Sequence, residues 1–150
     1  MVGDTAFLSA LVTALQSDVN LVTLTGHTSS DPRIFRGFPA KSGKTPALAV
    51  LRRVSTPVIK EHTFIKRYLI SLIGCGGKEF NAIQISDRVE ELVHVMNIGS
   101  AVSYYNFSNA DVTVYSTLWK SRVQSKFDEE VDYFKDENII EIVANPFNSC

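Results

Sequence analysis

The sequence predicts an α+β domain in which a mixed, mainly antiparallel sheet of roughly four to five strands packs against two amphipathic helices on one face. Two stretches have apolar side chains at helical spacing, and the rest of the chain contains several stretches rich in β-branched, aromatic and aliphatic residues. Each helix has one apolar face to cover, so a sheet with both helices on one side satisfies them together. With 45% hydrophobic and 21% charged residues, the composition is that of a globular protein.

The length of 150 residues fits a single domain, with a core at about residues 4–97 and a strand-rich C-terminal part at 98–150. The 15 basic and 16 acidic side chains give a net charge of -1, which argues against holding nucleic acid through many phosphates. No run approaches the roughly 18 apolar residues of a membrane helix, so we expect a soluble protein with no membrane role. Cys75 and Cys150 have no metal or redox spacing and are expected to be free thiols of a reducing compartment.

The first helix is expected from Asp4 to Ser17, with Asp4 as the N-cap that accepts the free N–H groups of the first turn. Its apolar positions follow the spacing of a helix with one buried face. These positions are Phe7, Leu8, Leu11, Val12 and Leu15. The following segment, Asp18 to Gly26, is short and apolar, and it is either a helical turn or a brief strand.

A long, partly ordered connection is expected from His27 to Pro46, where serine, threonine, proline and glycine surround a small apolar island. Such loops usually have a function or are mobile. Two strands follow, Ala47 to Val54 and Thr63 to Ile73, joined by a loop at residues 55–57. The second strand has apolar residues on both faces, which predicts a central place in the sheet.

Glycines at 74, 76 and 77 are expected to end this strand, because they allow positive φ angles and close approach of a helix. The clearest periodicity in the chain predicts that helix from Phe80 to Met96, ended by Asn97 and Gly99. Its apolar face is Ala82, Ile85, Val89, Leu92, Val93 and Met96, and its water-facing side is Gln84, Asp87, Arg88, Glu91 and His94.

The remaining residues predict mainly strands. The expected elements are a short β-prone piece from Ala101 to Phe107, a turn at residues 108–111, a strand from Val112 to about Gln124, and a final strand from Asn138 to Ala144.

The motifs that would indicate catalysis or cofactor binding all lack the required spacing or context. Gly43-Lys44-Thr45 is similar to the end of a phosphate-binding loop, but the distance from the preceding glycine is wrong and Pro46 leads into a β-prone stretch. The glycines at 74–77 fail the dinucleotide-binding pattern, and the histidines at 27, 62 and 94 have no metal-ligand spacing. We therefore expect no catalytic, cofactor-binding or metal-binding residues. Cys75 is the nucleophile to consider, although a structural thiol is the commoner role.

Six carboxylates fall close together near the C-terminus, offset by Lys135. They are Asp128, Glu129, Glu130, Asp132, Asp136 and Glu137. The general interpretation is a solvated loop or a strand edge protected by charge. The functional interpretation is a negative surface that repels nucleic acid or meets a basic partner.

Several segments taken in order resemble the tail terminator or tail-completion proteins of long-tailed bacteriophages. These are an N-terminal helix, an apolar turn, an Arg/Pro loop leading to a TPALAV strand, a long strand and a second helix. In this chain they read SALVTALQSDVNLVTLTG, RIFRGFP, TPALAVLRRV, FIKRYLISLIGC and ISDRVEELVHVM. The resemblance covers residues 6–96, whereas the part after the second helix is longer than the family pattern. No family site is therefore carried over residue by residue.

The resemblance implies a structural protein of the virion tail or neck, assembled in the host cytoplasm. It implies a homo-oligomeric, commonly hexameric ring that caps the tail tube and joins the tail to the head connector or stopper protein, with the sheath as a further partner in a contractile tail. DNA would pass through without specific binding, along a lumen to which the six carboxylates would contribute. Loops and added strands bridge subunits in such rings, so the candidate interface residues are Arg33, Phe35, Arg36, Phe38, Tyr104, Tyr105 and Phe107.

The alternative hypothesis is a monomeric ligand-binding or enzymatic α+β domain that uses the glycine-flanked Cys75 region. A reactive thiol at neutral pH would favour it, because the thiolate is the nucleophile.

Overall fold

The computed structural model describes residues 2–39, 44–59, 62–93 and 104–149. It has the predicted α+β architecture, with a five-stranded sheet in the order β1-β2-β3-β5-β4. β1 pairs with β2 in parallel, and the other neighbours are antiparallel. The strands are β1 (Ile34–Arg36), β2 (Ala47–Ile59), β3 (His62–Gly76), β4 (Thr113–Asp128) and β5 (Tyr133–Asn145). β3 is the central strand, as its two apolar faces predict.

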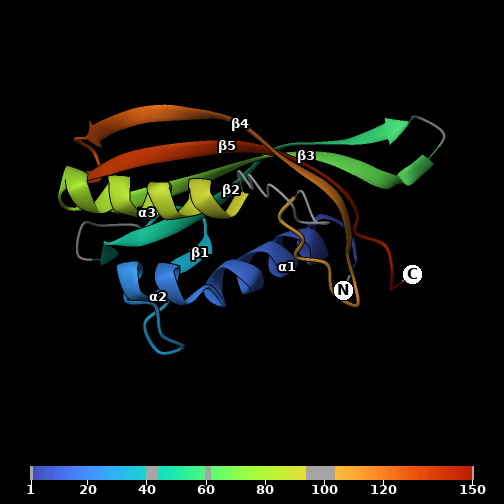
Figure 1. Ribbon diagram of the computed structural model, residues 1–150, viewed down its shortest axis with the longest axis horizontal. Helices are drawn as coiled ribbons and strands as arrows, with labels where there is room; N and C mark the ends of the chain where they lie inside the picture. The colour runs from blue at the N-terminus through green and yellow to red at the C-terminus, as the bar shows by residue number, and fades with distance from the viewer. Residues whose placement is uncertain (1, 40–43, 60–61, 94–103, 150) are drawn as a thin grey trace, which may run out of the picture.

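All three described helices lie on the same side of the sheet (Figure 1). They are α1 (Asp4–Gln16), α2 (Val19–Thr25) and α3 (Glu79–Val93). They bury the main core against one sheet face, with Phe7, Leu11 and Leu15 of α1 fully buried. No described helix alone is long and apolar enough to cross a membrane, and α1 with α2 meets that criterion only as a pair bent by 82°.

The prediction that Asp4 caps α1 is wrong. Gly3 occupies the N-cap position without a side-chain hydrogen bond, and Asp4 is the first helical residue. Its carboxylate turns instead toward β2 and β3, where it accepts hydrogen bonds from Ser55, Lys66 and Tyr68. The Lys66 ammonium group together with the two hydroxyls is a stronger set of partners for a carboxylate than backbone N–H groups alone.

For residues 18–26 the sequence allowed a helical turn or a brief strand, and the structure shows a helix. The carboxylate of Asp18 accepts a hydrogen bond from the Leu21 N–H at 2.9 Å, and Gly26 ends α2 with φ 72°, a left-handed conformation that suits glycine. The connection expected from His27 to Pro46 is in part a strand, because its apolar island forms β1. That strand pairs with residues 48–50 of β2.

The prediction of a loop at residues 55–57 is also wrong, because these residues lie inside β2 and pair with β3. β1 covers only Leu48–Val50, so the outer edge of β2 at Pro57 has no neighbouring strand among the described residues. Proline is tolerated at such an edge, since no ladder hydrogen bond is lost there.

The glycines at the end of β3 serve close packing, as predicted, but not through positive φ. Gly74 and Gly76 lie within β3, and a Cβ atom added to Gly74 would stand 2.6 Å from the carbonyl oxygen of Ala82 in α3. The described glycines with positive φ are Gly3, Gly26 and Gly37. The absence of a side chain at Gly74 and Gly76 therefore lets α3 lie directly on β3.

The second predicted helix is confirmed as α3, with Ala82, Ile85, Val89 and Val93 buried on its sheet side. The positions predicted beyond Val93, which include His94, Met96, Asn97 and Gly99, lie outside the described residues.

The C-terminal strands are longer than predicted. β4 and β5 extend to the turn at residues 129–132, and the predicted turn at 108–111 is present, with the Asn109 N–H donating to Val112 O at 2.9 Å. Residues 104–107 form no strand, and residues 101–103 lie outside the described part of the chain. β4 carries register shifts against β5 at Val114/Ser116, Trp119/Ser121 and Val123/Lys126. These bulges make β4 an irregular sheet edge.

Candidate functional site

The side of the sheet away from the helices is the candidate functional surface, here called the open face. The side chains that alternate outward from β2 to β5 form it, and rows of ion pairs cross it. Arg53 pairs with Glu137, and Glu141 lies 3.3 Å from Arg67 and 3.8 Å from Lys120. Leu51 and Ile73 lie beside Arg53 and Glu137, so the open face is mixed in character.

One end of the open face is hollowed into a groove of about 870 Å³. Leu51, Ile73 and Val123 lie on its floor, and Phe38 and Phe127 stand beside them, each 42% exposed. A surface groove with exposed aromatic side chains is typical of a protein contact.

The wall of the groove is fixed by contacts between the loop before β2 and strand β5. Lys135 Nζ lies 4.1 Å above the Phe38 ring and 2.8 Å from the Asp128 carboxylate. The Tyr133 hydroxyl donates to Pro39 O at 2.9 Å in a buried position. Phe38 is thereby held over the sheet although it lies in the connection between β1 and β2.

The six carboxylates do not form one solvated surface. Asp136 is 3% exposed and lies within β5, where it pairs with Arg122 at 2.8 Å. Glu137 is paired with Arg53 and Asp128 with Lys135. Glu129, Glu130 and Asp132 are exposed in the β4–β5 turn, and none of the three has an ion pair with a described residue; Glu129 and Glu130 also line the groove. The uncompensated negative charge is therefore confined to this turn.

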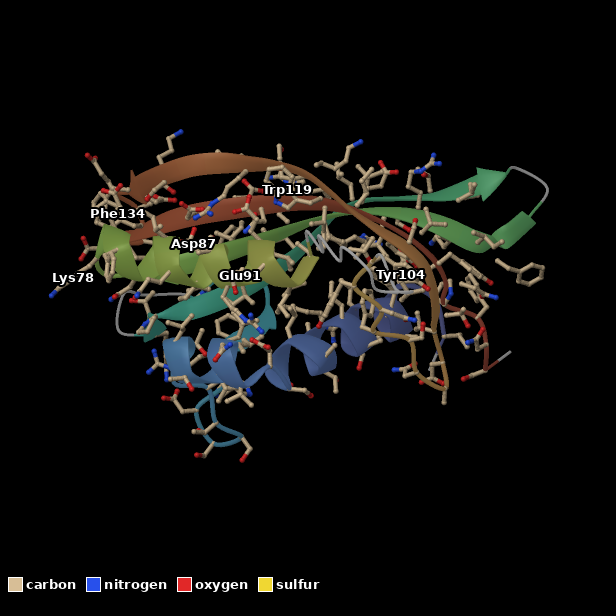
Figure 2. All side chains as sticks on the ribbon, in the orientation of Figure 1. Lys78, Asp87, Glu91, Tyr104, Trp119 and Phe134 are labelled. Carbon is tan, nitrogen blue, oxygen red and sulfur yellow. The ribbon has the colours of Figure 1, made fainter. Side chains whose placement is uncertain are left out.

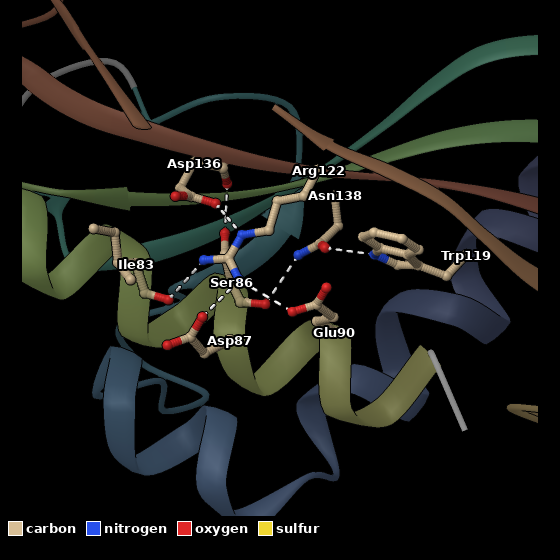
Figure 3. Close-up of polar contacts among 8 residues, drawn as sticks. All are labelled: Ile83, Ser86, Asp87, Glu90, Trp119, Arg122, Asp136 and Asn138. Carbon is tan, nitrogen blue, oxygen red and sulfur yellow. Dashed lines mark hydrogen bonds and ion pairs between the residues drawn. The ribbon is translucent and has the colours of Figure 1, made fainter. Parts of the chain in front are cut away.

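Arg122 forms a polar cluster that joins α3 to β4 and β5 (Figure 3). Its guanidinium donates to Asp136, to Asp87 at 2.5 Å, to Glu90 at 3.2 Å and to Ile83 O at 3.3 Å. Buried Asn138 donates to Ser86 O and accepts from the Trp119 indole, each at 2.9 Å. Every polar side chain of the cluster has a partner, so its role is to fix α3 on the sheet. Sequence reasoning missed it, and its signal was the pair of polar residues, Asp136 and Asn138, on the core side of β5.

A second cluster lies at the opposite end, around Asp4. Burial alone would raise the pKa of this carboxyl, but hydrogen bonds from Lys66, Tyr68 and Ser55 outweigh it and hold the pKa at about 2. Arg52 is a further ion-pair partner of Asp4. The Tyr68 ring stacks on Phe7 with 3.7 Å between ring centroids, so α1 is tied to β3 twice over.

The structure divides the predicted interface residues into two groups. Near β1, Arg36 and Phe38 are exposed, Phe35 is half-buried, and Arg33 is paired with Asp31 at 3.0 Å. At the other end, Phe107 is a core residue that meets Phe7 edge-on at 5.6 Å, and Tyr104 and Tyr105 are half-buried around it. Tyr104 lies far from Phe134 of the groove end in Figure 2. Of the predicted set, Phe38 lines the groove.

Cys75 is buried beneath the open face, and burial raises the pKa of its thiol to about 12. His27 accepts the backbone N–H groups of Arg33 and Ile34 at Nδ1, at 2.9 and 3.1 Å, which is a structural role in the loop. Among the described residues, no group of three or more histidine, cysteine or acidic side chains is arranged to hold a metal ion.

No protein-family model and no curated protein sequence matches the chain. Among solved structures, the fold is similar to a chain in a structure described as the virion of a native gene transfer agent particle. The TM-score is 0.52 with 13% sequence identity, and the match covers 94% of this chain and 96% of that chain. At 13% identity this similarity shows a shared fold, and the shared fold includes almost the whole of both chains.

Proposed function

We propose that this chain is a structural protein of a phage-like virion, and that it forms a ring that caps the tail tube and joins the tail to the head connector. The observation that carries the proposal is the fold, which is shared over 94% of the chain with a protein from a gene transfer agent virion. The order of its elements, from α1 through the long β3 strand to α3, also fits the tail terminator pattern read from the sequence. Its partners would be further copies of itself, the tail tube protein, the head connector or stopper and, in a contractile tail, the sheath.

The open face is where such a protein would make its contacts. It has no covering helix in Figure 1 and contains both a groove and exposed apolar side chains. Among the interface residues predicted from sequence, Arg36 and Phe38 are exposed and remain candidates for subunit contact. Arg33, Phe35, Tyr104, Tyr105 and Phe107 are more buried and would support the contact surface.

The exposed carboxylates of the β4–β5 turn have two uses in a ring. They would either line the passage and repel DNA or meet basic side chains of a partner. Asp128, Asp136 and Glu137 contribute less to such a field, because cations of the same chain compensate them.

The test is to add the purified protein to tail tubes that lack a terminator and to image them by negative stain. We expect a ring at one end of each tube and a tube that stops elongating. Tubes that stay uncapped at a molar excess of the protein would refute the proposal.

The alternative, a ligand-binding or enzymatic domain at Cys75, predicts a reactive thiol. Since burial raises the pKa of Cys75 to about 12, we expect no modification of the native protein by a thiol reagent at pH 7 and full modification after unfolding. Peptide mapping separates Cys75 from Cys150. Rapid native labelling of Cys75 would favour the alternative.

A further inference from the structure

The loop between α2 and β1, residues 26–33, is joined to β1 through the imidazole of His27. Its Nδ1 atom accepts the backbone N–H of Arg33 at 2.9 Å and that of Ile34 at 3.1 Å. Ile34 is the first residue of β1 and is fully buried. Figure 1 shows the loop projecting past α2, away from the sheet. One ring atom therefore closes the loop and holds the start of the strand.

The backbone of His27 is held in turn by α2. Its N–H donates to Thr25 Oγ1 at 3.3 Å, and this hydroxyl donates to Leu21 O at 2.7 Å in a buried position. On the strand side, Arg33 O accepts the N–H of Leu48 at 2.7 Å, so the residue that His27 holds also pairs with β2. His27 thus lies in a continuous series of hydrogen bonds from α2 to the sheet.

The two hydrogen bonds to Nδ1 require a neutral ring. A neutral imidazole that accepts at Nδ1 carries its proton on Nε2, whereas an imidazolium has a proton on both nitrogen atoms and accepts at neither. Protonation of His27 therefore removes the acceptor and points an N–H at the N–H groups of Arg33 and Ile34. Losing the acceptor is costly where the backbone is shielded from water, as it is at Ile34.

The charged groups that the structure describes around this loop offer no separate partner to an imidazolium. α2 and the residues of β2 that pair with β1 are uncharged, and the charged residue of α1, Asp4, lies at its opposite end. β1 contributes Arg36. Asp31, in the loop itself, already pairs with Arg33 at 3.0 Å and with Lys44 at 3.7 Å. Protonation would therefore add a positive charge beside a carboxylate that two cations already occupy.

We infer that His27 is a pH-sensitive latch, which holds the loop onto β1 while its ring is neutral and releases the start of β1 when the ring is protonated. The release affects candidate contact residues, because Arg33 begins the segment that leads through β1 to Phe38. The inference goes beyond the proposed ring and does not depend on it, since the hydrogen bonds concerned lie within one chain.

Hydrogen exchange followed by NMR on the full-length protein tests the latch at single amides. Protection factors, which correct for the slower intrinsic exchange in acid, are compared at about pH 7.5 and about pH 5, the range in which histidine side chains change charge. We expect protection of the Arg33 and Ile34 amides to fall about tenfold at the lower pH, since both lose their acceptor. The amide of Ile140, between β3 and β4, should keep its protection.

His27→Asn separates the latch from other effects of acid, because its amide oxygen can accept hydrogen bonds at either pH. In this variant the tenfold fall should vanish. His27→Ala should have low protection of both amides at both pH values. The matched control is His62→Asn, which removes a different imidazole and should leave the pH dependence at Arg33 and Ile34 unchanged.

The ¹⁵N shifts of the His27 ring report its protonation in the same samples. We expect the Nε2-protonated neutral form at the higher pH and the charged form at the lower. A ring protonated at Nδ1 in the neutral form, or one that stays neutral at pH 5, overturns the latch. So does undiminished protection of both amides beside a charged ring. The same tenfold fall in His27→Asn overturns it as well, because the fall would then belong to another group such as Asp31.

Discussion

At the scale of single residues, Asp4 has the most consequential set of contacts. Its partners Arg52, Ser55, Lys66 and Tyr68 lie 48 to 64 positions away in the chain. Sequence reasoning assigned Asp4 to a helix cap because a local pattern cannot reveal partners at such separations. The same limitation concealed Arg122, whose carboxylate partners come from α3 and β5.

Replacing Asp4 by asparagine should lower stability at neutral pH. The pKa of about 2 lies below the ordinary value of 3.8 for an aspartate, so the ionised carboxylate stabilises the folded state. That contribution is fully present above about pH 4 and is lost as the pH falls toward 2. Because Asp4 is partly exposed, we expect about 1 kcal/mol at pH 7 and a smaller difference at pH 2.

Urea unfolding at both pH values measures this difference. Glu129→Gln, at an exposed carboxylate without an ion pair to a described residue, is the control and should change neither value. An equal loss for Asp4→Asn at pH 2 and pH 7 would show that its effect is not electrostatic.

At the scale of elements, the sequence predicted what depends on local periodicity. α1, α3 and β3 were recognisable because apolar residues recur at the helical or strand period over many positions. β1 and the extension of β2 through Pro57 were not, since a three-residue strand has no periodicity and the tolerance for proline depends on which edge is unpaired.

The contact between β3 and α3 makes a prediction for two neighbouring glycines. In Gly74→Ala the new methyl group would lie 2.6 Å from Ala82 O, so α3 must shift and we expect a loss of about 1 to 3 kcal/mol. In Gly77→Ala the nearest atom is Thr45 Oγ1 at 3.8 Å, which is an ordinary contact, and stability should hardly change.

Thermal melting of both variants against the unmodified chain checks this difference. Equal stability of the two variants would mean that α3 does not depend on close packing against β3.

At the scale of the whole molecule, the fold class could be predicted but the functional surface could not. Phe38, Leu51, Val123 and Phe127 meet at one groove although they come from a loop and from two strands, β2 and β4, that are not neighbours in the sheet. Neither strand periodicity nor composition indicates which open-face residues become neighbours, because that depends on strand order and register. The acidic segment illustrates the same point, since half of it is neutralised by cations from other strands.

Hydrogen exchange should separate the end of the β2–β3 hairpin, where β3 has no pairing with β5, from the rest of the sheet. Amides at residues 58–59 and 62–65 have one neighbouring strand and should exchange fast, whereas amides of Ile139–Ile142 lie between β3 and β4 and should exchange slowly. Strong protection of these hairpin amides would show that the end of the hairpin is stabilised by other parts of the chain.

The bulges of β4 bear on how assemblies of this chain can grow. A straight edge strand accepts another edge along its length, and sheets joined in that way extend without limit, as in cross-β fibres. β4 is an outer strand of the sheet, and its register against β5 shifts between residues 114 and 116, 119 and 121, and 123 and 126. The unpaired N–H and C=O groups of β4 therefore do not align with those of a regular strand that approaches this edge. Strand-by-strand growth is therefore disfavoured at this edge, and a partner that binds along β4 has to be recognised through its side chains.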